Sequence, residues 1–176
     1  MPTISINGYL VQAKLEQALQ QIVAPANWRG REVRLPAGRR RWDMSYEIDG
    51  MITVVEFDGD EHYRHTLKIK TDEEKDAVAR EHGFRVIRFP YWIQLTSETL
   101  AHYFGLSADI EQDFPHGFVT TKIFPASFCE LGLIRFKREL DSLPSQVKTA
   151  VAASLRDRSA EHGIQYVLPV GLQNGF

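Results

Sequence analysis

Residues 40–62, Arg-Arg-Trp-Asp-Met-Ser-Tyr-Glu-Ile-Asp-Gly-Met-Ile-Thr-Val-Val-Glu-Phe-Asp-Gly-Asp-Glu-His, decide the fold because they encode two adjacent strands that carry carboxylates. We expect strands at residues 41–48 and 51–57, since both runs are largely apolar and the second is mostly β-branched or aromatic. Asp49 and Gly50 between them favour a two-residue hairpin turn, because both residues tolerate a positive φ. The stretch therefore predicts an antiparallel strand pair.

The segment before this hairpin predicts a helix over residues 8–24. Val11, Leu15, Leu19 and Ile22 recur there at steps of four, four and three, which places them on one helical face. Asn7 is a candidate N-cap for this helix, and Pro25 follows its end.

After the hairpin, a charged helix is predicted within residues 66–82, with Gly83 as its C-terminal cap. Thr66 is one possible start, but we prefer Thr71, because Thr71 and Glu74 have the spacing of a capping box. A strand over residues 84–89 follows and is stopped by Pro90.

The last part of the chain has a different character. Residues 107–125 are expected to be irregular, and the segments around them to form mostly helices. The expected elements are a short helix from Thr96 or Ser97 to Phe104, a helix over 127–141, a helix from Pro144 or Ser145 to His162, and a short strand over 164–168.

This order of elements predicts an α/β fold with a mixed central sheet flanked by helices and a mostly helical C-terminal extension. We divide the chain into a core at residues 1–105 and an extension at residues 106–176, which could also belong to the same domain. A length of 176 residues suffices for a sizeable core.

Composition limits the possible functions. The formal net charge of −2 argues against a binder that holds nucleic acid by overall charge, but it leaves room for an enzyme with a local basic groove. Cys129 is the only cysteine, so an intramolecular disulfide is impossible. The sequence has no secretory signal and no membrane-spanning apolar run, so we expect a cytoplasmic protein without a membrane partner.

The carboxylates of the hairpin strands are candidate metal ligands. Asp43 lies on the first strand, and Glu56 and Asp58 lie at the end of the second. Glu56 and Asp58 are two residues apart, so their side chains point to the same face of the strand. Carboxylates in apolar strands lose solvation unless a positive charge lies between them, and Mg²⁺ prefers such oxygen ligands. Singly, Asp43 could be a surface residue at a strand end, and Asp58 with Gly59 a turn.

The ordered set of motifs resembles a known family. Arg41-x-Asp43, then Glu56-Phe57-Asp58-Gly59-x-x-His62, then the run from Gly83 to Phe89 are similar to the PD-(D/E)xK nuclease superfamily, in particular the branch of proteins like the very-short-patch-repair endonucleases. The resemblance covers roughly residues 8–105 and implies a restriction-endonuclease-like fold. It implies an endonuclease that hydrolyses phosphodiester bonds in DNA with Mg²⁺, for which Mn²⁺ can substitute.

The resemblance also assigns roles to residues. Asp43, Glu56 and Asp58 would hold the metal with the backbone carbonyl of Phe57, and His62 would act as general base or orient the attacking water. The lysine of the wider superfamily is replaced here by Asp58, so we consider lysines elsewhere. The supporting candidates are Glu16 on the first helix, Lys68, Lys70 and Arg88.

An arginine-rich segment precedes the first carboxylate. It is either a solvated loop or a surface that contacts phosphates, and its position before Asp43 favours the second. Its members are Arg29, Arg31, Arg34, Arg39, Arg40 and Arg41.

Several alternatives stay open from the sequence. A nuclease-fold protein without activity would bind nucleic acid or a protein partner, and RNA is an alternative substrate. A monomer would nick one DNA strand, whereas cutting both strands would need a homodimer or two successive nicks.

Overall fold

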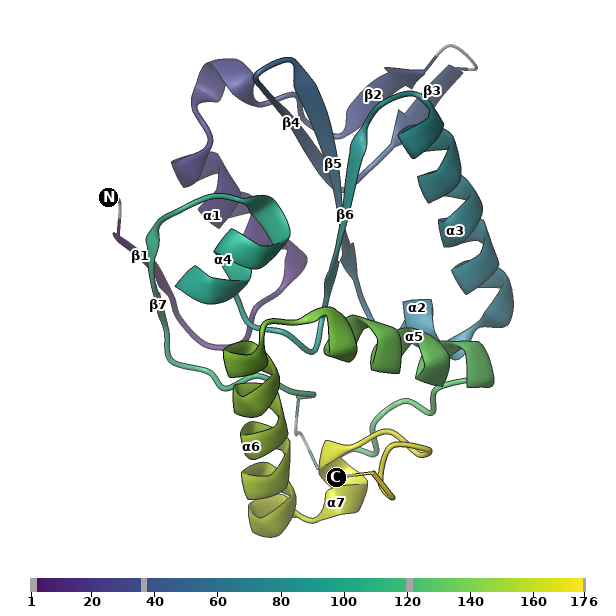
Figure 1. Ribbon diagram of the computed structural model, residues 1–176. Coiled ribbons are helices and arrows are strands. Elements are labelled where there is room, and N and C mark those ends of the chain that lie inside the picture. The colour runs from purple at the N-terminus through teal and green to yellow at the C-terminus, as the bar shows by residue number, and fades with distance from the viewer. Residues whose placement is uncertain (1–2, 36–37, 120–121, 176) are drawn as a thin grey trace.

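The computed structural model describes residues 3–35, 38–119 and 122–175 and contains both helices and strands (Figure 1). The mixed α/β class predicted from the sequence is confirmed. The elements in order are β1 (Thr3–Ile6), α1 (Gln12–Ile22), the 3₁₀ turn η1 (Pro25–Asn27), β2 (Glu32–Leu35), β3 (Gly38–Arg41), β4 (Met44–Ile48), β5 (Met51–Asp58), α2 (Glu61–Arg64), α3 (Thr66–Glu81), β6 (Arg85–Pro90), α4 (Ser97–Phe104), β7 (Asp109–Gln112), α5 (Glu130–Ser142), α6 (Ser145–His162) and α7 (Ile164–Val167).

The central sheet has the strand order β4-β5-β6 and is mixed. β4 and β5 pair antiparallel through the predicted hairpin, in which Asp49 and Gly50 have φ values of 52° and 77°. Positive φ at both turn positions is what a tight two-residue hairpin requires. β5 and β6 pair parallel, and α2 and α3 provide the crossover between them.

The two faces of this sheet are covered by different helices. Val55 of β5 belongs to the main core together with Leu15 and Leu19 of α1, and α4 packs on this same face (Figure 1). Val54 points to the other face and packs in a smaller cluster with Ala79 of α3. Side chains alternate along β5, so Glu56 and Asp58 follow Val54 on the face that α3 covers.

Two small sheets lie beside the central one and were not predicted. β2 and β3 form an antiparallel hairpin where the sequence indicated an irregular arginine-rich loop. β7, which pairs parallel with β1, lies in a segment that we expected to be irregular. Val33 and Leu35 are buried while Glu32 and Arg34 are exposed, so β2 has the alternation of a strand with one buried face.

Three local predictions were wrong. α3 begins at Thr66 and not at Thr71, whose hydroxyl donates to the backbone carbonyl of Leu67 inside the helix. α1 begins after Val11, so Asn7 is not its N-cap. Residues 164–167 form the short helix α7 instead of a strand.

The start of α4 agrees with the sequence. Thr96 caps this helix, and Thr99 completes its capping box. The helices predicted over 127–141 and from Ser145 to His162 are present as α5 and α6.

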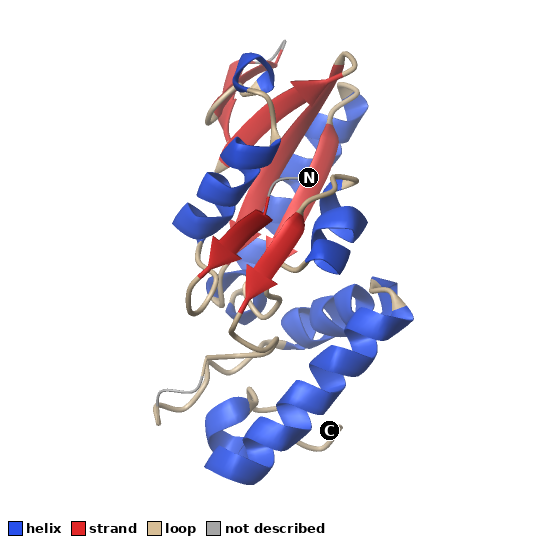
Figure 2. Ribbon diagram, turned by 90° about the vertical axis from the view of Figure 1, so that its left-hand side faces the viewer, coloured by secondary structure: helices blue, strands red, loops and turns tan. Residues whose placement is uncertain are grey.

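The C-terminal helices share a core with the rest of the chain. Phe136 of α5 packs on Trp92, which follows β6, with ring centroids 4.7 Å apart. Gly132 lets α5 approach α2, because a Cβ atom at this position would lie 1.8 Å from the backbone oxygen of Tyr63. In Figure 2, α5, α6 and α7 lie below the strands and close the lower end of the central sheet.

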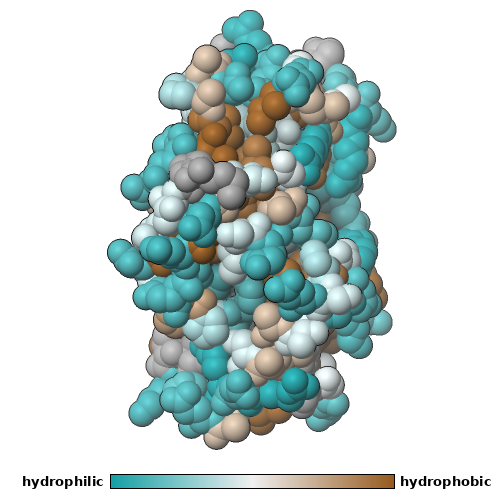
Figure 3. All heavy atoms as spheres, turned by 60° about the vertical axis from the view of Figure 1, so that its left-hand side comes forward, coloured by the Kyte–Doolittle hydropathy of each residue, from teal (hydrophilic) through white to brown (hydrophobic). Residues whose placement is uncertain are grey.

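The surface is mainly hydrophilic on the face shown in Figure 3, where apolar atoms gather mostly in the upper half. None of the helices in the described part of the chain combines the length and the apolarity that crossing a membrane requires.

Candidate functional site

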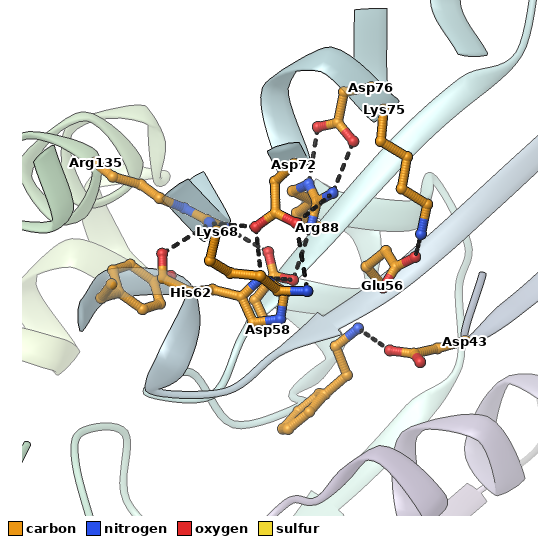
Figure 4. Close-up of polar contacts among 12 residues, drawn as sticks. Asp43, Glu56, Asp58, His62, Lys68, Asp72, Lys75, Asp76, Arg88 and Arg135 are labelled. Carbon is orange, nitrogen blue, oxygen red and sulfur yellow. Dashed lines mark hydrogen bonds and ion pairs between the residues drawn. The ribbon is translucent and has the colours of Figure 1, made fainter. Parts of the chain in front are cut away.

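Two of the predicted carboxylates lie together in an open pocket beside α3. The pocket has a volume of about 220 Å³ and is lined by Arg31, Arg41, Trp42, Asp43, Glu56 and Lys75. A water molecule takes up roughly 30 Å³ in the liquid, so the pocket has room for a cation with several waters. Figure 4 shows Lys75 of α3 pointing to Glu56 of β5, with Asp43, which directly precedes β4, close by.

Asp43 immediately precedes β4 and is held against β5 by a backbone contact. Its Oδ2 accepts a hydrogen bond of 2.8 Å from the N–H of Phe57. The N–H and C=O of one strand residue point to the same edge, so the carbonyl of Phe57 faces the side on which Asp43 lies. The other carboxylate oxygen of Asp43 has no hydrogen bond within the described residues and is available to a ligand.

Glu56 is half-buried on the α3 face of β5. Burial raises the pKa of its carboxyl above the ordinary value of 4.5, Lys75 opposes this effect, and the charge of Asp43 adds to it. Asp43 and Glu56 therefore lie close enough for their charges to repel. Such a pair of carboxylates favours a cation between them.

Lys75 is the cation that the sequence analysis missed. Its ammonium forms a hydrogen-bonded ion pair with Oε1 of Glu56 and lies 4.1 Å from the centre of the Trp42 ring. Helical spacing could have identified it, because Lys68, Asp72, Lys75 and Ala79 recur at steps of four, three and four. A helix that starts at Thr71 contains three of these four positions and leaves out Lys68.

Asp58 lies in a separate network of buried ion pairs. Its side chain is fully buried, and its carboxylate accepts hydrogen bonds from Arg88, at 2.8 Å, and from Arg135. Nδ1 of His62 lies 3.3 Å from Asp58 and 2.5 Å from Asp72. Figure 4 shows this network at the end of β5, next to the pocket that contains Asp43 and Glu56.

The two arginines of this network connect five elements, β5, β6, α2, α3 and α5. Arg88 of β6 donates to both oxygens of Asp76 on α3, at 2.8 and 2.9 Å. Arg135 of α5 donates to Glu139 at 2.7 Å and to the backbone carbonyl of His62 at 3.2 Å. Burial alone would lower the pKa of Arg88 and of Arg135, but the surrounding anions raise both above the ordinary value.

Ligand atoms of Asp58, His62 and Asp72 lie within 4.8 Å of one another, so the three could hold a metal ion by distance alone. Both carboxylates, however, already contact arginine guanidinium groups. Burial would raise the pKa of Asp72, but the hydrogen bond from His62 and the charge of Arg88 hold it below 3.8. A divalent ion would have to displace two arginines, so the arrangement fits an internal ion-pair network better than a metal centre.

The remaining candidates from the sequence lie around these two sites. Lys68 is 3.9 Å from Asp72 at the edge of the buried network, and Lys70 is exposed on α3. Arg88 belongs to that network. Glu16 is on α1, which packs on the opposite face of the central sheet from Glu56.

The arginine-rich segment contributes two side chains to the pocket. Arg31 and Arg41 line it, and Nε of Arg31 donates to the backbone carbonyl of Asp43 at 3.3 Å. Arg29 instead pairs with Glu47 at 3.2 Å. Arg34 and Arg40 are exposed, and the side chain of Arg39 lies outside the described part of the structure.

Comparison of the chain with protein-family models, curated proteins and solved structures gives no match in any of the three. The functional argument therefore rests on the geometry of the pocket. Its two carboxylates are the oxygen ligands that a hard divalent cation prefers, and its cationic side chains can bind an anion.

Proposed function

We propose that the protein is a metal-dependent nuclease of the PD-(D/E)xK type, with a restriction-endonuclease-like fold, that hydrolyses phosphodiester bonds in DNA. The observation that carries the proposal is the contact of Lys75 with Glu56 beside Asp43, in a pocket lined by two arginines. The superfamily motif combines two acidic residues with a lysine. Here the lysine would come from α3 instead of β5.

The order of the elements supports the same assignment. A helix, an antiparallel hairpin with Asp43 and Glu56, a crossover helix and a parallel strand follow one another in the described chain. This is the order on which the resemblance to the superfamily rests.

Each residue of the pocket has a chemical role in this proposal. Asp43, Glu56 and the Phe57 carbonyl would hold Mg²⁺, or Mn²⁺ in its place. The bound ion would supply Lewis acidity and lower the pKa of a coordinated water. Lys75 would donate to a phosphate oxygen and stabilise the charge that develops on it, and Arg31 and Arg41 would bind flanking phosphates.

In this proposal we assign Asp58 and His62 a different role from the one expected from the sequence. Asp58 is fully buried and paired with two arginines, so it would support the end of β5 instead of binding the metal. His62 is buried against Asp72 and would position this network instead of acting as general base.

A second candidate is a non-catalytic protein that binds nucleic acid or a protein partner. The ion pair between Lys75 and Glu56 favours it, because the pair gives Glu56 a charge partner without any metal.

The two candidates differ in DNA cleavage. We expect the protein to nick or linearise supercoiled plasmid with Mg²⁺ or Mn²⁺ and not with EDTA. Asp43→Asn, Glu56→Gln and Lys75→Met should each reduce the rate by at least about 100-fold. The first two weaken a metal ligand, and the third removes the ammonium that would stabilise charge on the phosphate. Lys70→Met changes an exposed lysine of the same helix and should retain wild-type activity.

The same cleavage assay also defines the result that would contradict the proposal. If the wild type leaves plasmid, mismatched, branched and single-stranded DNA and RNA uncut, the non-catalytic candidate replaces the nuclease. If the protein cleaves RNA alone, the proposed metal site stands and the proposed substrate changes from DNA to RNA.

A further inference from the structure

The ion pair at Glu56 places two cations in competition for one carboxylate. Oε1 of Glu56 contacts the ammonium of Lys75, and the exposed fractions of the two side chains are 12% and 22%. The metal that we propose for this pocket needs the charge of the same carboxylate. The Lys75 ammonium therefore occupies the place where the metal ion would bind.

Charge balance indicates which cation should prevail. Asp43 and Glu56 contribute two negative charges, and Lys75 neutralises one of them. A divalent cation matches the pair of carboxylates more fully and repels an ammonium at the same oxygen. Lys75 would therefore leave Glu56 when a divalent cation binds.

Trp42 provides a place for the displaced ammonium. The Lys75 ammonium already lies over the Trp42 ring, and the attraction of a cation to an indole face does not require Glu56. The ring is 2% exposed and packed against Val33, Val54 and Ala79, so it is fixed in position. An ammonium released from Glu56 can stay over the ring, at the edge of the pocket where Arg31 and Arg41 also lie.

We propose that Lys75 is an exchangeable cation, which occupies Glu56 in the metal-free protein and is displaced when a divalent metal ion binds to Asp43 and Glu56. This inference rests on the proposed metal site. It differs from a role in which Lys75 only helps to assemble that site, because it predicts that removing Lys75 strengthens metal binding while it impairs cleavage.

The test measures Mn²⁺ binding by titration calorimetry at pH 8, in the absence of DNA, so the readout does not depend on activity. We compare the full-length wild type with Lys75→Met, Lys75→Arg and the exposed control Lys70→Met. We expect Lys75→Met to bind Mn²⁺ about tenfold more tightly, because a partly buried ion pair no longer has to be broken. Lys75→Arg keeps the competing charge and should stay near the wild type, as should Lys70→Met.

The outcomes separate this inference from the metal site itself. If the wild type binds Mn²⁺ and Lys75→Met binds it equally or more weakly, exchange is wrong while the proposed metal site remains. If neither protein binds Mn²⁺, both proposals fail. A urea unfolding curve shows whether Lys75→Met is folded. If Lys75→Met is not folded, Lys75→Arg gives a second comparison. Tighter Mn²⁺ binding by Lys75→Arg than by the wild type would also contradict the exchange.

Discussion

At the scale of single residues, Arg88 connects the carboxylates of β5 and α3. It bonds Asp58 and both oxygens of Asp76, and all three side chains are largely buried. Arg88→Met would leave the buried Asp76 without its main partner and Asp58 with Arg135 alone. We expect the free energy of unfolding to fall by about 3–5 kcal/mol, measured by urea denaturation.

Arg80 provides the matched control. It lies 3.7 Å from the same carboxylate of Asp76, but its side chain is 61% exposed. Exposed ion pairs contribute about 0–1 kcal/mol, so Arg80→Met should change stability by less than about 1 kcal/mol. Equal effects of the two substitutions would show that burial does not set the strength of this network.

Asp72 gives the network a dependence on pH. Its folded-state pKa is lowered below 3.8, because the hydrogen bond from His62 and the charge of Arg88 outweigh the effect of burial. A lowered pKa means that the ionised form stabilises the fold above the unfolded-state value, and that this stability is lost as the pH falls through the folded-state pKa.

Asp72→Asn should therefore be less stable than the wild type at pH 7, by about 1–3 kcal/mol. The difference should be constant down to about pH 5 and then shrink as the pH falls below 3.8. Urea unfolding curves of both proteins between pH 7 and pH 2.5 measure it. A difference that grows in acid would contradict the assigned direction of the pKa.

The sequence predicted part of this chemistry. Asp43 and Glu56 were found because one hairpin holds them together. Asp58 was assigned to the metal because it follows Glu56 by two residues and so lies on the same face of the strand. Its partner Arg135, in contrast, lies 77 residues away in the chain. Local patterns do not reveal a contact at that separation, so neither the buried network nor the role of α5 in it was predicted.

At the scale of elements, the docking of α5 on α2 depends on Gly132. The backbone oxygen of Tyr63 accepts a hydrogen bond from the N–H of Cys129 and lies where a Cβ of residue 132 would be. Gly132→Ala would force the two helices apart. Alanine is more favourable than glycine inside a helix by about 1 kcal/mol. Any loss of stability in Gly132→Ala must therefore come from the clash.

We expect Gly132→Ala to lower the free energy of unfolding by at least about 2 kcal/mol, because a backbone atom cannot move aside as a flexible side chain can. Gly59→Ala is the control, since nothing lies within 4 Å of a Cβ at that position and its φ is not positive. Thermal unfolding followed by circular dichroism compares the two. A Gly132→Ala protein as stable as the wild type would mean that α5 does not approach α2 this closely.

Element prediction succeeded where local signals are strong. The hairpin turn, the strand β6 and the capped helix α4 all have turn or capping residues in their own sequence. It failed for β1 and β7, because each has four residues and the partner is more than 100 positions away. Short strands of this kind form through pairing, and their own residues specify them weakly.

At the scale of the whole molecule, the C-terminal helices are joined to the strands by both apolar and charged contacts. Tyr63 is fully buried, stacks on Phe128 at 4.9 Å and donates to Glu139 on α5. Arg135 connects the same helix to Asp58. The predicted core ends at residue 105, but contacts that complete the hydrophobic core come from beyond it.

This arrangement predicts that the two parts unfold together. All three tryptophans, Trp28, Trp42 and Trp92, lie before residue 105, whereas α5 and α6 supply much of the helix. Fluorescence of Trp28 and Trp42 therefore reports on the part before residue 105, whereas Trp92 also senses α5 through its contact with Phe136. Far-ultraviolet circular dichroism includes a large contribution from the C-terminal helices. We expect the two signals to change at the same urea concentration, because coincident transitions are the mark of two-state unfolding. Arg135→Met should move both transitions to lower urea by the same amount, since it removes a partner of Asp58 and Glu139 from one shared network. A loss of circular dichroism at lower urea than the fluorescence change would show instead that the C-terminal helices unfold as a unit of their own.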